Sequence, residues 1–307
     1  MTRPLLRLSQ AQLNLLERCP RKFQYTYLEQ VLAPASPEET ERQLWGSQFH
    51  LRMQQHELGV LHRSERESDD VFQIAAEALV AALPEIFGGD QDGDRPQKPR
   101  HSEHRRSLSV EGYLLTVVYD LVVLGDQQAQ IFDWKTYRKP QRRGWLEESW
   151  QTRLYPFVLA ETTDYEPEDI SMTYWFINPR QIEHQRSQQL GENDEAQSES
   201  AELIAPESIT FPYSTFQHQA TRQELQALLT ALTQYLDLGD TGYAQASQRQ
   251  ANSGAAPYLF PQIPEQGEVC PTCPYALRCG RSPHPSHRNW FDIAELLDIE
   301  PIEEISL

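Results

Sequence analysis

A run of twelve residues, YLLTVVYDLVVL at positions 113–124, constrains the fold of this chain more than any other feature. It is apolar almost throughout, which is typical of a β-strand that is covered on both faces. A strand of this kind needs elements packed on each of its faces, so the sequence predicts a layered α/β fold. One acid, Asp120, interrupts the run. An ionised carboxylate in such surroundings needs a cation or hydrogen-bond donors beside it.

The next strand, IFDWK at 131–135, is predicted to form a hairpin with the first. The four residues Gly125–Gln128 make a suitable hairpin loop. Pairing Leu124 with Ala129 across this loop places Asp120 directly opposite Asp133, with Cβ atoms about 4.5–5.5 Å apart. Two facing carboxylates repel each other unless one is protonated or a cation lies between them.

Two cations could meet this need. Lys135 lies on the same face as Asp133, because alternate side chains of a strand share a face. A divalent metal ion is the other natural occupant, since hard cations prefer carboxylate oxygens. The alternative interpretation is a buried ion pair that does no chemistry.

The other periodic segments predict helices on both sides of a mixed sheet. A capping box at Ser9–Gln12 opens a first helix, which Pro20 must interrupt. The predicted helices and strands are, for helices, 37–60, 69–86, 146–161 and 215–238, and, for strands, 101–110, 113–124, 129–136, 171–177 and 208–213. We expect a single domain over residues 1–283, divided into a helical part 8–87, a loop 88–99, a core 100–240 with a flexible insertion 180–206, and a cysteine segment 262–283, followed by an acidic tail 284–307.

The formal net charge of −18 argues against a protein that coats nucleic acid broadly. The acidic residues, however, gather in separable segments, at 192–202 and after Arg288. Five basic residues follow Asp133 within ten positions: Lys135, Arg138, Lys139, Arg142 and Arg143. A charge run of this kind is either a solvated face or a surface that holds an anionic ligand.

Nothing in the sequence predicts a membrane protein. Hydrophobic residues make up 39% of the chain, and no apolar run approaches the roughly 18–20 residues of a membrane span. The first residues lack the pattern of a signal peptide. We therefore expect a soluble, cytoplasmic protein.

An ordered set of short motifs resembles a known family. In chain order these are Gly46-x-x-x-His50, the strand acid Asp120, Asp133-x-Lys135 and Gln151-x-x-x-Tyr155. This set resembles the PD-(D/E)XK nuclease superfamily, and within it the RecB-type nuclease domain shared by RecB, AddB and the CRISPR-associated iron–sulfur exonucleases. The opening LSQAQLNLLERCPRKFQYTYL is similar to that family's N-terminal signature, and the resemblance extends to Cys279.

The resemblance implies a restriction-endonuclease-like fold and a role for each matched residue. His50, Asp120 and Asp133 would bind Mg²⁺ or Mn²⁺, and Lys135 would orient the attacking water and stabilise charge on the phosphate. Gln151 and Tyr155 would support the site and contact DNA.

One further assignment comes with the resemblance: Glu103 is the candidate for an upstream acid of the family. The basic residues follow Lys135 directly, so they would lie beside the metal and hold the phosphate backbone; they are Arg138, Lys139, Arg142 and Arg143.

The chain has four cysteines, and they predict a second metal centre. Cys270, Cys273 and Cys279 lie close together near one end, and Cys19 lies near the other. In a cytoplasmic protein disulfides are disfavoured, so metal binding is the better interpretation. Four thiolates suit either zinc or a [4Fe–4S] cluster, and free structural thiols are a third possibility. The resemblance favours an iron–sulfur cluster that staples the N- and C-terminal segments together.

Three functions fit these observations. The first is a metal-dependent DNA exonuclease acting on single strands or duplex ends in repair or recombination, with a helicase or recombination protein as a partner. The second is a catalytically silent iron–sulfur subunit that binds DNA or a partner protein. The third is a nuclease that processes RNA or CRISPR spacer precursors.

Overall fold

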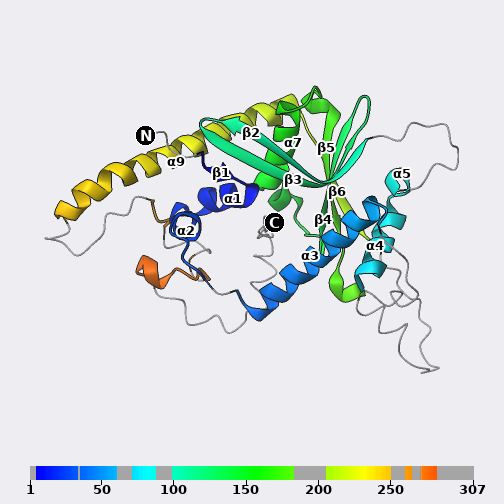
Figure 1. Cartoon of the computed structure of the whole chain (residues 1–307), viewed down its shortest axis with the longest axis horizontal. Coiled ribbons are helices and arrows are strands. Elements are labelled where there is room, and N and C mark those ends of the chain that lie inside the picture. The colour runs from blue at the N-terminus through cyan, green and yellow to red at the C-terminus, as the bar shows by residue number, and fades with distance from the viewer. Residues whose placement is uncertain are drawn as a thin grey trace.

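The computed structural model shows a mixed β-sheet between two layers of helices, as the sequence predicts (Figure 1). It describes residues 5–33, 35–60, 71–87, 99–182, 205–249, 260–264, 270 and 272–281, with side chains of 238–249 left out. Nearly all of the predicted loop 88–99, most of the insertion 180–206 and the whole tail 284–307 fall outside the described residues.

The sheet has six strands: β1 (Arg7–Leu8), β2 (Arg100–Val110), β3 (Tyr113–Leu124), β4 (Ala129–Lys135), β5 (Ile170–Phe176) and β6 (Glu207–Pro212). The strand order is β1-β3-β4-β5-β6, and β2 also pairs with β3. The pairs β1–β3 and β4–β5 are parallel, and the other three are antiparallel. The long strand β3 is therefore the centre of the sheet: β2 follows it along one edge, while β1 and β4 pair with its opposite ends.

The register of the β3–β4 hairpin is the one that the sequence predicts. Leu124 pairs with Ala129, and Gly125 N donates to Gln128 O across the loop at 2.9 Å. The ladder continues to the pair Leu121–Phe132. Strand β1 was not predicted, because two residues are too short to show a periodic pattern.

The helices are α1 (Gln10–Arg18), α2 (Pro20–Phe23), α3 (Pro37–Glu57), α4 (Val71–Ala82), α5 (Pro84–Phe87), α6 (Arg143–Glu148), α7 (Trp150–Glu161) and α9 (Thr215–Arg249), with a π-helical turn at Gln24–Leu28 and 3₁₀ turns at Pro167–Asp169 and Leu277–Cys279. Two predicted helices, 69–86 and 146–161, are each divided in two. The second is divided at Ser149, whose hydroxyl accepts a hydrogen bond from Gln151 N at 3.3 Å and so begins α7.

The sheet separates two hydrophobic cores. On one face α1, α7 and α9 cover side chains such as Leu115, Val122 and Ile131. On the other face α3 and α4 cover Leu121 and Phe132. Both cores are needed because β3 and β4 bury both of their faces, and the described helices show no segment with the length and apolarity of a membrane crossing.

Candidate active site

The alternation of side chains along β3 breaks at Asp120. Val117 and Tyr119 face the core under α7, whereas Leu121, at the same parity, faces the core under α3. In the neighbouring strand β2, the pairs on either side of this point are Ser102–Leu121 and His104–Tyr119, which leaves Glu103 opposite Asp120. Glu103 has a positive φ of 50°, unusual for a residue with a side chain. Local irregularities in a strand commonly re-aim side chains at functional sites.

The carboxylates of Asp120 and Glu103 meet His50 of α3. Nδ1 of His50 lies 3.3 Å from Asp120 Oδ1 and 4.0 Å from Glu103 Oε1. Its other nitrogen, Nε2, lies 3.0 Å from the carbonyl oxygen of Trp134 and must donate to it. Nδ1 of a neutral His50 therefore turns a lone pair toward two carboxylates, an arrangement that requires a proton or a metal ion between them.

The spacing of these three groups suits a small divalent cation. One ligand atom from each of His50, Glu103 and Asp120 lies within 4.8 Å of the other two. Ligands of an octahedral Mg²⁺ at about 2.1 Å are about 3.0 Å apart when adjacent and about 4.2 Å apart when opposite. Burial alone would lower the pKa of His50, but Asp120, Asp133 and Glu103 outweigh it and raise the pKa to about 9. The cluster thus attracts positive charge.

Asp133 lies in a closed triangle of polar side chains. Its Oδ2 is 2.8 Å from Lys135 Nζ, and its Oδ1 accepts from Gln151 Nε2 at 2.5 Å. Lys135 Nζ also donates to Gln151 Oε1 at 2.8 Å. Burial raises the pKa of Asp133 to about 6, with Lys135 acting in the opposite direction and Asp120 in the same direction. Burial lowers the pKa of Lys135, but Asp133 beside it outweighs burial and holds the pKa above its usual value.

Asp120 joins the triangle to the His50 cluster. Its Oδ2 accepts a hydrogen bond from the backbone N of Trp134 at 2.6 Å, while Oδ1 faces His50. The β3–β4 ladder ends at the pair Leu121–Phe132, and beyond it this side-chain hydrogen bond to Trp134 N links the two strands. Asp120, Asp133, Lys135, Gln151 and His50 are thereby brought together by β3, β4, α7 and α3.

Tyr155, the remaining member of the motif set, lies in the core one turn along α7. It is 1% exposed, its ring packs edge-on against Tyr119 at 5.4 Å, and its carbonyl oxygen accepts from the Tyr119 hydroxyl at 3.0 Å.

Two residues that the sequence did not suggest support the site beside Lys135. They are Tyr174 and Thr152. The ring of Tyr174, on β5, has Lys135 Nζ at 5.4 Å from its centroid. The Tyr174 hydroxyl lies 2.7 Å from Thr152 Oγ1, at the first turn of α7. No sequence signal marks this contact, because Thr152 and Tyr174 lie on different elements, 22 residues apart, that only the tertiary fold brings together.

The predicted DNA-holding residues lie between β4 and α6 or at the start of α6. Arg138, Arg142 and Arg143 are exposed, and Lys139 is half-buried. Arg143 donates to Thr210 O at 2.9 Å and lies over the Phe211 ring at 4.3 Å, and Lys139 Nζ is 3.3 Å from Glu207. The run is thus a partly anchored basic surface beside β6.

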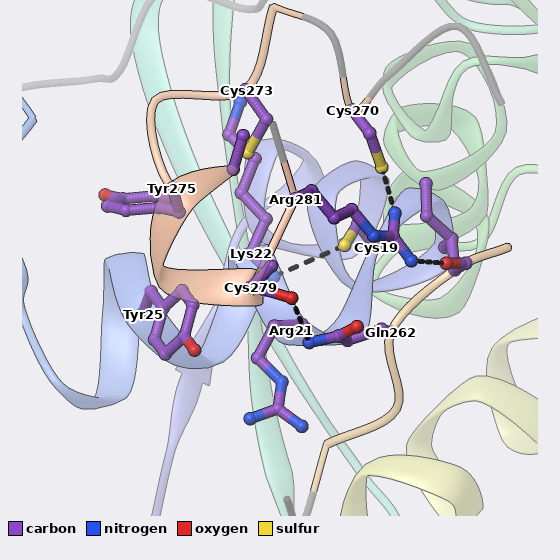
Figure 2. A pocket seen from close by; sticks show the side chains of 12 residues that line it. Cys19, Arg21, Lys22, Tyr25, Gln262, Cys270, Cys273, Tyr275, Cys279 and Arg281 are labelled. Atoms are coloured by element: carbon purple, nitrogen blue, oxygen red, sulfur yellow. Dashed lines mark hydrogen bonds between the residues drawn. The ribbon is translucent and has the colours of Figure 1, made fainter. Parts of the chain in front are cut away.

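The four cysteines line one pocket, although they come from opposite ends of the chain (Figure 2). None forms a disulfide. The segment carrying Cys273 and Cys279 packs on the N-terminal helices: the Tyr275 ring lies edge-on to Tyr25 at 5.4 Å, and its hydroxyl donates to Val31 O at 2.7 Å. The two ends of the described chain are therefore in direct contact.

Two sulfur atoms of this pocket accept hydrogen bonds. Lys22 N donates to Cys19 Sγ at 3.4 Å, since Cys19 is the N-cap of α2, and Arg281 Nη1 donates to Cys270 Sγ. Burial raises the pKa of the Cys273 and Cys279 thiols. A metal ion bound to these sulfur atoms would favour their thiolate form.

The comparison with protein-family models decides the family. The model of the PD-(D/E)XK nuclease superfamily matches residues 7–280, which is most of the chain. The chain belongs to the PD-(D/E)XK nuclease superfamily.

The other comparisons add little to this assignment. No curated protein matches the chain significantly. Ten chains of known structure match, among them the crystal structure of SSO0001, which is 11% identical and covers 75% of this chain and 79% of its own with a TM-score of 0.31. A similarity this distant supports no further argument. Membership of the superfamily implies nuclease activity on a nucleic-acid substrate with a divalent metal.

Proposed function

We propose that this PD-(D/E)XK protein is a Mg²⁺- or Mn²⁺-dependent DNA exonuclease of the RecB/AddB type that acts on single strands or duplex ends in repair or recombination. The observation that carries the catalytic part is the meeting of the His50–Glu103–Asp120 cluster with the Asp133–Lys135–Gln151 triangle at one point of the sheet. A catalytically silent relative would have no need to keep all of these groups together.

The metal ligands fit the residues present. His50 Nδ1, Glu103 and Asp120 would hold the ion, and Asp133 would join them once it releases its contact with Lys135. A bound divalent ion supplies a Lewis acid for the phosphoryl oxygen and lowers the pKa of a bound water. Compared with the ligand set expected from the sequence, this proposal adds Glu103.

The chain's own residues supply the rest of the chemistry. The Lys135 ammonium, held by Asp133 and Gln151, is placed to orient the attacking water and to stabilise the negative charge that develops on the phosphate. Gln151 fixes both partners through its two amide atoms. The basic surface at Arg138–Arg143 would hold the phosphate backbone.

The pocket of four cysteines supports a [4Fe–4S] cluster as the second cofactor. All four cysteines line the same pocket, so Cys19, Cys270, Cys273 and Cys279 would act together as the four thiolate ligands of one centre. The cluster would join the chain ends and have a structural role.

Cleavage of end-labelled DNA tests the proposal. The protein should degrade single-stranded DNA in Mg²⁺ or Mn²⁺ and stop in EDTA, and blocking one end at a time should protect the strand from only one direction. Cleavage of strands with both ends blocked would instead show an endonuclease. Activity on RNA alone would favour the RNA-processing alternative.

A further inference from the structure

A groove beside the catalytic cluster has no part in the reaction proposed above. It lies between α6, α7, the edge strand β6 and the first turns of α9. Three aromatic side chains line it: Phe211, Tyr213 and Phe216. Phe211 and Tyr213 are buried, but Phe216 is 80% exposed at the rim. One exposed apolar residue is ordinary, but an exposed aromatic ring over an aromatic-lined groove is a surface on which a flat ring can stack.

The charges of the groove suit an uncharged ligand rather than a phosphate. Arg153, which lines it, is 2.6 Å from Glu224 and 3.1 Å from Glu17. Glu147 adds a further acid to the lining. The basic side chain of Arg143 lies at the edge, over the ring of Phe211. The groove therefore offers one exposed ring, Phe216, at its rim and a cation from the basic surface at its margin, the combination that binds single-stranded nucleic acid by stacking its bases while cations follow its backbone.

The groove and the catalytic cluster draw on neighbouring residues at the start of α7. Thr152 lines the groove, and the residue before it, Gln151, bonds to Asp133 and Lys135. The Thr152 hydroxyl contacts Tyr174, whose ring lies under Lys135. Pro156, also in the lining, is only about 7.5 Å farther along the helix axis than Gln151, at 1.5 Å per residue. Along α7 the groove is therefore separated from the catalytic cluster by no more than the length of a few nucleotides.

We propose that this groove binds a base of the single-stranded nucleic acid near the cleaved bond, with Phe216 as its stacking surface. The inference rests on the proposed nuclease function and adds the recognition of unpaired bases. A base within a duplex could not enter, because it is already stacked and paired. The groove would thus favour single strands and frayed ends over intact duplex.

Binding of a fluorescently labelled oligothymidylate, measured by anisotropy in EDTA to prevent cleavage, tests the inference. Phe216→Ala should weaken binding about tenfold, equivalent to about 1.4 kcal/mol, whereas Phe216→Trp should bind like the wild type. Leu44→Ala is the matched control, because Leu44 is 60% exposed on α3 and lies outside the groove. The salt dependence of binding should be the same in all variants, since none changes a charge.

A set of oligonucleotides, each with one abasic position, separates stacking from other effects. The wild type should lose about tenfold in affinity at one position, and Phe216→Ala should show no additional loss there. Equal affinity of Phe216→Ala and the wild type, or equal losses at every abasic position in both proteins, would overturn the inference and leave the groove as a surface for a protein partner. These outcomes leave the proposed function intact if the wild type cleaves DNA; that function fails only if the wild type does not cleave.

Discussion

At the scale of single residues, His50 shows how the backbone selects a ligand atom. The carbonyl oxygen of Trp134 occupies Nε2, so only Nδ1 can face the carboxylates. The raised pKa of His50 has the same origin, because in the absence of a metal a proton is the cation that Asp120 and its neighbours attract. A divalent ion would replace that proton, since a metal-binding imidazole must be neutral.

Glu103 is a metal ligand in the proposal based on the structure, but it is not in the ligand set expected from the sequence. Glu103→Gln should weaken Mn²⁺ binding about tenfold, or about 1.4 kcal/mol, because the carboxylate near His50 loses its charge. Isothermal titration calorimetry of the purified protein measures this. Glu41→Gln, on the exposed side of α3, is the control and should bind Mn²⁺ normally. Unchanged affinity in Glu103→Gln would remove Glu103 from the ligand set.

Lys135 is expected to act on the reaction and not on the metal. Lys135→Ala should lower kcat by about 10²–10³-fold, the usual loss when one donor to a developing charge is removed, and should leave Mn²⁺ affinity nearly unchanged. Lys139→Ala provides the comparison, since Lys139 belongs to the basic surface and pairs with Glu207. This substitution should raise KM and leave kcat unchanged. Loss of metal binding in Lys135→Ala with turnover retained would contradict this role.

At the scale of elements, the sequence predicted the hairpin that carries the acids, but it did not predict the break in side-chain alternation along β3 at Asp120. The apolar run of β3 and the four-residue loop determine the register, and the structure has that register. The break in alternation at Asp120 lies opposite Glu103 with its positive φ, and the sequence pattern predicted neither feature. Glu103 is close to Asp120 only through that strand pairing, so sequence spacing could not identify it securely.

The same limit applies to other parts of the site. Gln151 and Tyr155 share a helical spacing, but only Gln151 contacts the acids directly, while Tyr155 packs against Tyr119. The Tyr174–Thr152 contact had no sequence signal at all. Short motifs therefore indicate which residues carry chemistry, and tertiary packing decides which of them meet.

The hairpin should depend on the buried side chains of β4 for stability. Ile131 of β4 is fully buried against the α7 side of the sheet. Ile131→Ala should lower the free energy of unfolding by about 2–5 kcal/mol, through lost burial and the cavity that remains. Gln130→Ala, at the half-buried position before it, should lower it by less than about 1 kcal/mol. Urea denaturation followed by circular dichroism compares the two, and equal losses would show that the burial of Ile131 does not stabilise the hairpin as described.

At the scale of the whole molecule, the two ends of the described chain meet at the cysteine pocket. Protein purified without oxygen should contain about four irons per chain. Cys19→Ser should lose that iron and lower the melting temperature about as much as Cys270→Ser, because cluster binding is linked to folding. Serine is a favourable N-cap, so the change at the start of α2 should cost little by itself. A full complement of iron in Cys19→Ser would show that the cluster does not join the two ends.

The net charge of −18 belongs to the same scale. It makes specific, local contacts with nucleic acid necessary, because the protein as a whole repels a polyanion. The basic surface at Arg138–Arg143 and the aromatic groove beside it are two places where we propose such contacts.

Asp133 and its neighbours are proposed to form the metal-dependent nuclease site. The most direct measurement is single-turnover cleavage of labelled single-stranded DNA in Mn²⁺ by the wild type and by Asp133→Ala, with binding of the same DNA measured in EDTA. We predict that Asp133→Ala cleaves at least about 10³-fold more slowly and still binds DNA, because the change removes negative charge from the site. Undiminished cleavage by Asp133→Ala would contradict the account.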